Sequence, residues 1–203
     1  MSKRVMLIRH GRTAWNAERR YMGHTDMDLD DIGILQAAKT HCRLKAEKIG
    51  RVYASDSRRA YNFASMLFKG KAVVRVPDLR EMNFGVLEGM TYNEVVGRYP
   101  QAYDEWLSGA DPSGIPEGES VRSFSERVLR AFGGIVSSDG SGPLAIVTHA
   151  GPIRTIVNSI ECSGRFRDLI PDHASISMIE YGGYGPRLLS VNDTSHLSGE
   201  RDG

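Results

Sequence analysis

The sequence predicts an α/β protein with three layers, in which helices cover both faces of a mostly parallel central sheet. Short apolar runs bounded by polar residues alternate with segments whose apolar residues recur at helical spacing. Such alternation favours parallel strands, because each connecting helix crosses a face of the sheet before the next strand begins. The 203 residues can bury a sizeable core, so we expect one domain over 1–203 with a lid-like helical insertion at about 82–119.

Six apolar or β-branched runs are expected as strands: residues 5–8, 51–54, 73–76, 144–147, 176–181 and 187–191. Helices are expected after the capping residue Asp30, over 58–67, near 91–98 and 101–107, after the capping residue Ser120, and after His149 through Val157. The glycine-rich turn at residues 182–185 predicts that the last two strands form a hairpin. Residues 109–118 are rich in turn formers.

The composition excludes several classes of partner. Lysine and arginine number 26 against 25 aspartate and glutamate, which gives no bulk attraction to nucleic acid or to an anionic membrane. No apolar stretch is long enough to cross a bilayer, and the N-terminal run stops at Arg9, too early for a signal peptide. We expect a cytoplasmic protein in which Cys42 and Cys162 are free, buried thiols within helices.

Two strand ends carry the same chemistry. His10 follows the run at 5–8 and His149 follows the run at 144–147, and open α/β sheets bind ligands at the carboxyl ends of their strands. Neighbouring strands would bring both imidazoles into one crevice. Gly11 would let a ligand approach the backbone, and the helix onset expected at Gly151-Pro152 offers free N–H groups to an anion. Arg9 adds a guanidinium, which binds phosphate oxygens in a fork.

The segment Arg9-His10-Gly11-Arg12-Thr13-Ala14-Trp15-Asn16 resembles the opening signature of the histidine phosphatase superfamily, also called the phosphoglycerate mutase-like family. The resemblance implies that His10 is a phosphate-attacking nucleophile and that Asn16 donates its amide to the phosphate. It implies further that the insertion lies over the active site.

Two later segments extend the resemblance. Ser55-Asp56-Ser57-Arg58-Arg59-Ala60 is similar to the family's second phosphate-binding motif, in which the arginine before alanine, here Arg59, reaches the phosphate. Ser57 and Phe63 replace the usual leucine and threonine of that motif, and Arg58 is expected on a solvated helix face. The segment from Leu79 to Gly89 resembles the one that carries the family's acid, which maps onto Glu81. Glu88 in the same segment is expected to be structural.

Together these residues predict a metal-free, two-step phosphoryl transfer. His10 attacks phosphorus while Arg9, Arg59, Asn16 and His149 hold the phosphate oxygens. Glu81 protonates the leaving oxygen and then, ionised, activates water. Catalytic roles therefore fall to His10, Glu81 and His149, and substrate contacts to Arg9, Asn16, Arg59, Gly11 and Ala150.

The predicted function is a phosphomonoesterase acting on a small phosphorylated metabolite. A compact insertion and a short C-terminal segment favour a phosphatase over a cofactor-dependent phosphoglycerate mutase, and the pattern around Phe84 and Pro116 most resembles α-ribazole phosphatase. A non-catalytic phosphate-binding module is the third alternative. The sequence leaves the physiological substrate and the oligomeric state open.

Other site chemistries fit the sequence less well. Asp26, Asp28 and Asp30 lack the glycine and glutamate spacing of a calcium loop and follow no apolar strand, so we expect an acidic loop and a helix cap. The remaining histidines lack tight zinc-ligand spacing, and no Gly-x-Gly-x-x-Gly follows a strand. We therefore expect neither a metal nor a nucleotide cofactor.

Overall fold

The computed structural model describes residues 3–108, 115–138 and 142–198. Its six-stranded sheet has the order β3-β2-β4-β1-β5-β6. The strands are β1 (Lys3–Arg9), β2 (Arg51–Ala54), β3 (Val73–Arg75), β4 (Leu144–Thr148), β5 (Ile176–Gly182) and β6 (Gly185–Asp193). The first four strands run parallel, whereas β5 is antiparallel to β1 and pairs with β6 in the expected hairpin.

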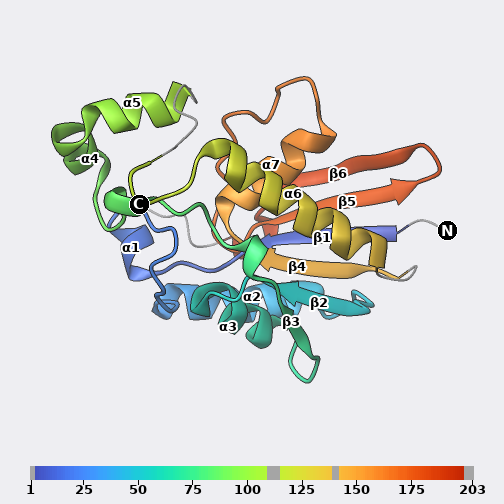
Figure 1. The fold of residues 1–203 in the computed structure, drawn as a ribbon. Helices are drawn as coiled ribbons and strands as arrows, with labels where there is room; N and C mark the ends of the chain where they lie inside the picture. The colour runs from blue at the N-terminus through green and yellow to red at the C-terminus, as the bar shows by residue number, and fades with distance from the viewer. Residues whose placement is uncertain (1–2, 109–114, 139–141, 199–203) are drawn as a thin grey trace.

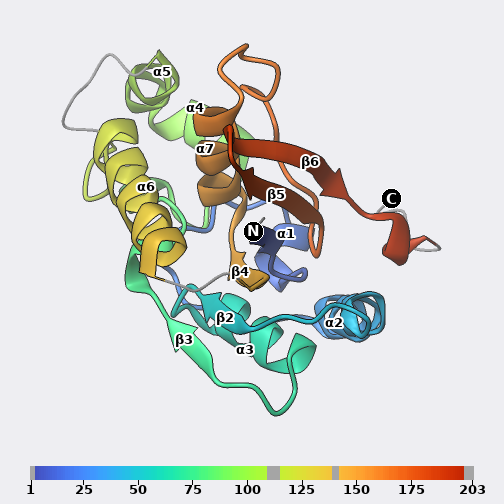
Figure 2. The ribbon, with the colours of Figure 1, turned by 90° about the vertical axis from the view of Figure 1, so that its right-hand side faces the viewer.

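Helices cover both faces of this sheet, which confirms the three-layer α/β prediction (Figures 1 and 2). The helices are α1 (Ala14–Ala17), α2 (Asp31–Leu44), α3 (Arg58–Leu67), α4 (Tyr92–Arg98), α5 (Pro100–Ser108), α6 (Val121–Ser138) and α7 (Ala150–Ile160), with short 3₁₀ turns at Pro77–Leu79, Gly85–Leu87 and Ser195–Leu197. Helices α6 and α7 pack on one face, and α2 and α3 pack on the other.

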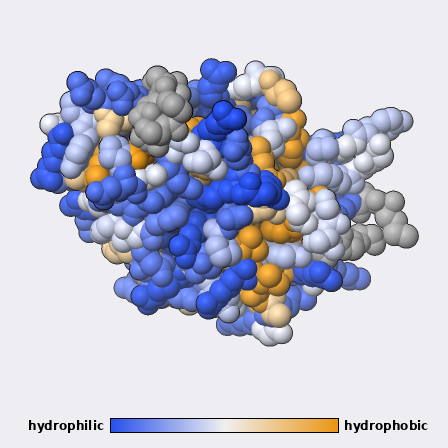
Figure 3. All heavy atoms as spheres, in the orientation of Figure 1, coloured by the Kyte–Doolittle hydropathy of each residue, from blue (hydrophilic) through white to orange (hydrophobic). Residues whose placement is uncertain are grey.

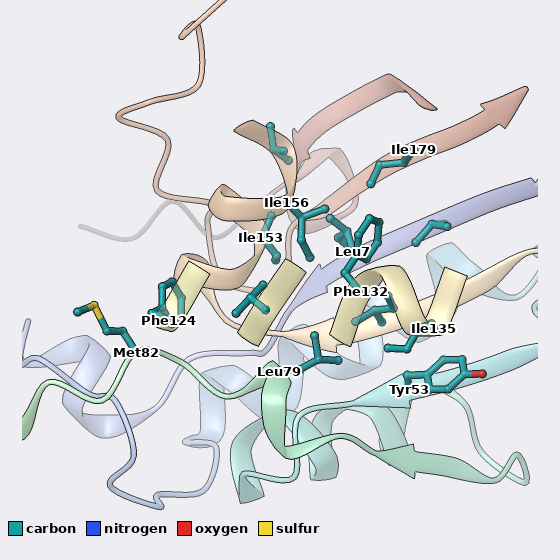
Figure 4. Packing of buried hydrophobic residues seen from close by; sticks show 14 of the residues in the cluster. Leu7, Tyr53, Leu79, Met82, Phe124, Phe132, Ile135, Ile153, Ile156 and Ile179 are labelled. Atoms are coloured by element: carbon teal, nitrogen blue, oxygen red, sulfur yellow. The ribbon is translucent and has the colours of Figure 1, made fainter. Parts of the chain in front are cut away.

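Alternation along the buried strands divides the core into two parts, one on each face. Leu7 and Ile146 belong to the cluster beneath α6 and α7, which Figure 4 shows from close by. Ile8 and Val147, the next residues along the same strands, belong to the cluster beneath α2 and α3. All five residues of β4 are buried, as expected for a central parallel strand.

Capping side chains set several helix starts where the sequence predicts them. The Asp30 carboxylate accepts a hydrogen bond of 2.8 Å from the Gly33 N–H, and the Ser120 hydroxyl accepts one of 3.1 Å from the Ser123 N–H. Ser57 precedes α3 without such a side-chain bond. Its hydroxyl is used elsewhere, as described below.

The helices α4 and α5 lie beyond the end of the sheet where β1 ends, on the same side as α1 (Figure 1). They occupy the expected insertion, and most of the turn-rich stretch at 109–118 lies outside the described residues. The face of the molecule in Figure 3 is mostly hydrophilic, with hydrophobic residues gathered in small groups. Across the described ranges, every helix is too short or too polar to span a bilayer.

The cysteine prediction is wrong on two points. Cys42 lies in α2 but faces solvent, and Cys162 lies in the turn after α7 and is also exposed. Both are free thiols. Helical spacing placed Cys42 with the apolar residues Ile32, Leu35 and Ala38, but the buried stripe of α2 consists of other residues, among them Ala37 and Leu44.

Candidate active site

His10 and His149 lie side by side because β1 and β4 are neighbours. Arg9 pairs with Thr148 at the end of the parallel ladder, and the His10 N–H donates to the Thr148 carbonyl at 3.0 Å. The two ring centroids are 5.0 Å apart, and both side chains are buried. The expectation that the two strand ends bring the imidazoles together is confirmed.

The His10 ring is held in one tautomer. Its Nδ1 lies 2.7 Å from the Gly11 carbonyl oxygen, which can only accept, so Nδ1 carries the proton and Nε2 keeps its lone pair. Burial lowers the pKa of His10 well below 6.5, and the charges of Arg59 and Arg9 lower it further. His10 is therefore a neutral imidazole with a nucleophilic Nε2 at physiological pH.

His149 is engaged at both ring nitrogens. Arg59 Nε donates to its Nδ1 at 3.3 Å, which leaves the proton on Nε2. His149 Nε2 lies 2.9 Å from the Ser55 hydroxyl and 3.3 Å from that of Ser57. Ser57, which replaces the family's usual leucine, thus contacts the second histidine. Burial and the Arg59 charge lower the pKa of His149.

Two arginines supply the positive charge, Arg59 from a fully buried position and Arg9 from a partly buried one. The side chain of Arg59 is fully buried, and its Nη1 and Nη2 donate to the carbonyls of Thr25 and Gly23 at 2.9 and 2.7 Å. Arg9 Nη1 donates to the Pro171 carbonyl at 2.5 Å, whereas its buried Nε has no partner among the described residues. Burial lowers the pKa of each guanidinium to about 10, which still leaves both charged at neutral pH.

Glu81 lies at the N-terminus of α7. Its Oε2 accepts from the Gly151 N–H at 3.0 Å, and its Oε1 accepts from the Met82 N–H at 2.9 Å. The carboxyl group is mostly buried. The N-terminus of α7 and these two backbone donors fix the position of the carboxyl group. Glu81 and Arg9 both line a cavity, which is described below.

Three further predicted residues have different surroundings. Asn16 Oδ1 accepts from the Thr13 N–H and hydroxyl at 3.2 and 3.0 Å, so its Nδ2 donors remain for a ligand. Ala150 begins α7 and lines the cavity. Gly11 is explained by packing, because a Cβ there would lie 2.7 Å from the Gly33 carbonyl oxygen. The absence of a side chain at Gly11 is thus required by the close approach of α2, and a contact between its backbone and a ligand stays a prediction.

A cavity of about 620 Å³ leads away from these groups. Arg9, Asn16, Glu81 and Ala150 line its inner end, and His10, His149 and Arg59 are not among its lining residues. The rest of the lining includes an aromatic cluster and residues of α6 and α7. The aromatic cluster consists of Tyr21, Phe84 and Trp106, whose ring centroids lie 5.4 to 6.0 Å apart.

Sequence reasoning missed one neighbour of His10. The ring of His173 lies 6.2 Å from that of His10, and burial lowers its pKa to about 2. Its Nε2 is buried without a partner in the described part of the chain. His173 precedes β5, which pairs with β1, so the proximity comes from sheet pairing and leaves no local signal in the sequence.

Residues expected to be structural have structural partners. Asp30 caps α2, and Asp28 accepts from Asn62 and from the exposed side chain of Arg58. Glu88 accepts from the N–H groups of His24 and Thr25 at 2.6 and 2.7 Å. The described residues contain no cluster of metal-binding side chains.

Two buried imidazoles, two guanidinium groups and a carboxyl group therefore gather where parallel strands end, which defines an α/β protein with a candidate site for a small anion. The sequence pattern of the histidine phosphatase superfamily (branch 1) matches residues 5–194. The chain belongs to this superfamily.

Several relatives share nearly the whole chain. It is 33% identical over 199 residues to the metal-independent phosphoserine phosphatase of Arabidopsis thaliana. The alignment covers 96% of this chain and 83% of the relative. The α-ribazole phosphatase of Shigella flexneri superposes with a TM-score of 0.84 at 26% identity, over 94% of this chain and 96% of that one. A phosphoglycerate mutase of Bacillus anthracis str. Sterne has the same TM-score and identity, over 97% and 95%.

The mutase covers the chain as fully as the phosphatases do. Coverage of the chain therefore does not by itself separate the two activities. The likeness to α-ribazole phosphatase in the sequence pattern is consistent with the structural comparison.

Proposed function

We propose that the protein is a metal-independent phosphomonoesterase that works through a phosphohistidine on His10. The observation that carries the proposal is the fixed tautomer of His10, whose Nδ1 is held by the Gly11 carbonyl and whose Nε2 lone pair is free to attack. The names of the relatives support a phosphatase. Their substrates, phosphoserine and α-ribazole phosphate, are candidates for this chain.

The first step transfers the phosphoryl group to the protein. His10 Nε2 forms a bond to phosphorus as the bond to the leaving oxygen breaks, and Glu81, in its acid form, gives its proton to that oxygen. The guanidiniums of Arg9 and Arg59 and the Asn16 amide offset the charge on the phosphoryl oxygens. His149 contributes by fixing Arg59 through their shared hydrogen bond.

The second step returns the site to its starting state. Glu81, now a carboxylate, takes a proton from a water molecule whose oxygen attacks phosphorus. The bond between phosphorus and Nε2 breaks, inorganic phosphate leaves, and Glu81 is again an acid. In each step the atoms, charges and protons balance among His10, Glu81, the substrate and one water molecule.

The proposal is tested by hydrolysis of p-nitrophenyl phosphate in EDTA. Wild type should turn over and form an acid-labile, base-stable phosphoprotein, and His10→Ala should do neither. His41→Gln is the matched control, because His41 lies on α2 and its ring, within the described part of the chain, bonds only to the Leu67 carbonyl. Inactive wild type, or an active His10→Ala variant, would refute the proposal.

The same protein distinguishes the two alternatives. Transfer of phosphate from 2,3-bisphosphoglycerate to 2-phosphoglycerate faster than release to water would identify a mutase. Binding of phosphate without phosphorylation of His10 would identify a binding module. Release of phosphate from phosphoserine or α-ribazole 5'-phosphate at a higher kcat/KM than from p-nitrophenyl phosphate would rank the substrates.

A further inference from the structure

One face of α7 lines the cavity. Ala150 and Gly151 lie at the inner end of the cavity, and the polar residues Arg154, Thr155 and Asn158 lie further out. Their spacing of four residues keeps them on one face of the helix. Because each residue advances the helix by about 1.5 Å, Arg154 stands about 6 Å along the axis from Ala150. That distance is about the length of a short carbon chain.

Arg154 is a cation that has no side-chain partner among the described residues. Its guanidinium has no hydrogen bond or ion pair within the described ranges, although the side chain is half-buried and lines the cavity. The other cations lining the cavity are engaged: Arg20 binds Glu18 and Glu94, and Arg9 binds the Pro171 carbonyl. Glu81 is the one carboxyl group of the lining, and it is held by the N–H groups of Met82 and Gly151.

The position of Arg154 offers no benefit to the helix itself. Arg154 is the sole charged residue of α7 and lies in its N-terminal half, whereas helix dipoles favour cations at the C-terminal end. The N-terminus of α7 already attracts negative charge. An arginine here adds a second anion-binding group beyond the phosphate site, and its fork of donors can bind both oxygens of a carboxylate.

We propose that Arg154 binds a carboxylate on the leaving group, so that the preferred substrates are phosphomonoesters of short hydroxy acids. This inference rests on the proposed function. The Arg9 and Arg59 guanidiniums balance a phosphate dianion, and Arg154 then pairs with the additional negative charge of the alcohol. Thr155 and Asn158 provide neighbouring polar groups for the rest of that alcohol. A neutral leaving group would leave the Arg154 guanidinium unpaired.

One pair of substrates isolates this charge. 3-Phosphoglycerate and glycerol 3-phosphate share a carbon skeleton, and only the first carries a carboxylate. Wild type should prefer 3-phosphoglycerate in kcat/KM by about 10- to 100-fold, the range expected for a hydrogen-bonded ion pair. Arg154→Met should remove most of that preference, chiefly by lowering kcat/KM for 3-phosphoglycerate. Arg154→Lys should retain part of the preference.

The matched control is Arg130→Met on α6, an exposed arginine that is absent from the cavity lining and should leave the preference intact. Equal losses for both substrates in Arg154→Met would indicate a structural role and overturn the inference. An unchanged preference would overturn it as well.

A binding measurement separates this inference from the proposed function. In the His10→Ala background, calorimetry should show tighter binding of 3-phosphoglycerate than of glycerol 3-phosphate, and adding Arg154→Met should abolish the difference. Equal binding of both ligands would refute the carboxylate subsite even if wild type hydrolyses both. A difference abolished by Arg154→Met would support it even if wild type hydrolyses neither.

Discussion

Gly151 makes room for the Glu81 carboxylate. The Gly151 N–H donates to Glu81 Oε2 at 3.0 Å, and a Cβ at Gly151 would overlap Glu81 Oε1. The absence of a side chain at the second residue of α7 therefore lets the acid reach the helix N-terminus. A glycine that looks like part of a turn signature in the sequence is required for this position of Glu81, the proposed proton donor.

We predict that Gly151→Ala lowers kcat/KM by about 10²-fold or more for alkyl phosphates, because a displaced general acid loses its contribution. The overlapping atom is the end of a flexible side chain, so the melting temperature should change little. Steady-state kinetics and thermal unfolding measure the two effects. Gly133→Ala in α6, where a Cβ meets nothing within 4 Å, is the control. Wild-type kcat/KM in Gly151→Ala would contradict this role of Gly151.

Local patterns predicted most of the fold and the residues of the site. Each expected strand overlaps an observed one, and the central strands β1 and β4 contain continuous apolar runs because they are buried in the sheet. The helix α1 was not predicted, since the four residues of Ala14–Ala17 are too few to show a period. Strand order could not be read from the sequence either. The neighbours β1 and β4 are separated by more than a hundred residues, and only their pairing brings His10 beside His149.

The same limit explains the errors within the site. His173 approaches His10 because β5 pairs with β1, with the Ala174 N–H donating to the His10 carbonyl at 3.1 Å. The packing of Gly11 against Gly33, a contact between distant segments, was likewise not predicted. Residue type indicates what a side chain can do, and long-range packing decides which neighbour it meets.

Glu88 positions Arg59 through the intervening loop. The Glu88 carboxylate accepts from the His24 and Thr25 N–H groups and from the Thr25 hydroxyl, and the carbonyls of Gly23 and Thr25 accept from Arg59. We predict that Glu88→Ala weakens inhibition by inorganic phosphate about tenfold or more, since a loosened guanidinium binds the anion less well. Glu88→Gln, which retains one acceptor oxygen, should lie between Glu88→Ala and wild type.

Inhibition constants from competition with p-nitrophenyl phosphate measure this effect. Glu126→Ala, which removes an exposed carboxylate paired with Arg122 on α6, should leave the constant unchanged. If Glu88→Ala binds phosphate as well as Glu126→Ala does, the loop does not position Arg59.

Buried neutral histidines should make the fold sensitive to acid. Burial lowers the pKa of His10 and His149 well below 6.5 and that of His173 to about 2. Below pH 6.5 the unfolded chain binds protons at these positions while the folded chain does not, so the free energy of unfolding falls with falling pH. Each histidine contributes up to about 1.4 kcal/mol per pH unit in this window, until its folded pKa is reached.

Urea unfolding at a series of pH values between about 7.5 and about 5 measures this dependence. His173→Asn should reduce the slope of the free energy of unfolding against pH by the contribution of one histidine. The contributions of His10 and His149 should remain. A free energy of unfolding that is constant across this window would show that the three imidazoles are not buried and neutral.

Arg127 holds the segment that carries Glu81. Its guanidinium donates to the carbonyls of Asp78, Arg80 and Glu81 at 2.9, 2.9 and 2.8 Å, and pairs with Glu119 at 2.6 Å. Arg127→Met leaves these acceptors and the carboxylate without their donor. We predict a loss of about 2–4 kcal/mol in the free energy of unfolding, together with a lower kcat/KM because Glu81 moves.

Urea unfolding and kinetics on one protein preparation measure both effects. Arg122→Met is the matched control on the same helix, because Arg122 is mostly exposed and pairs only with Glu126 in the part of the chain that the structure describes. Its removal should change stability by less than about 0.5 kcal/mol. If the two variants unfold at the same urea concentration, the bonds of Arg127 do not stabilise the fold. If Arg127→Met loses stability but keeps wild-type kcat/KM, Arg127 supports the fold without positioning the acid.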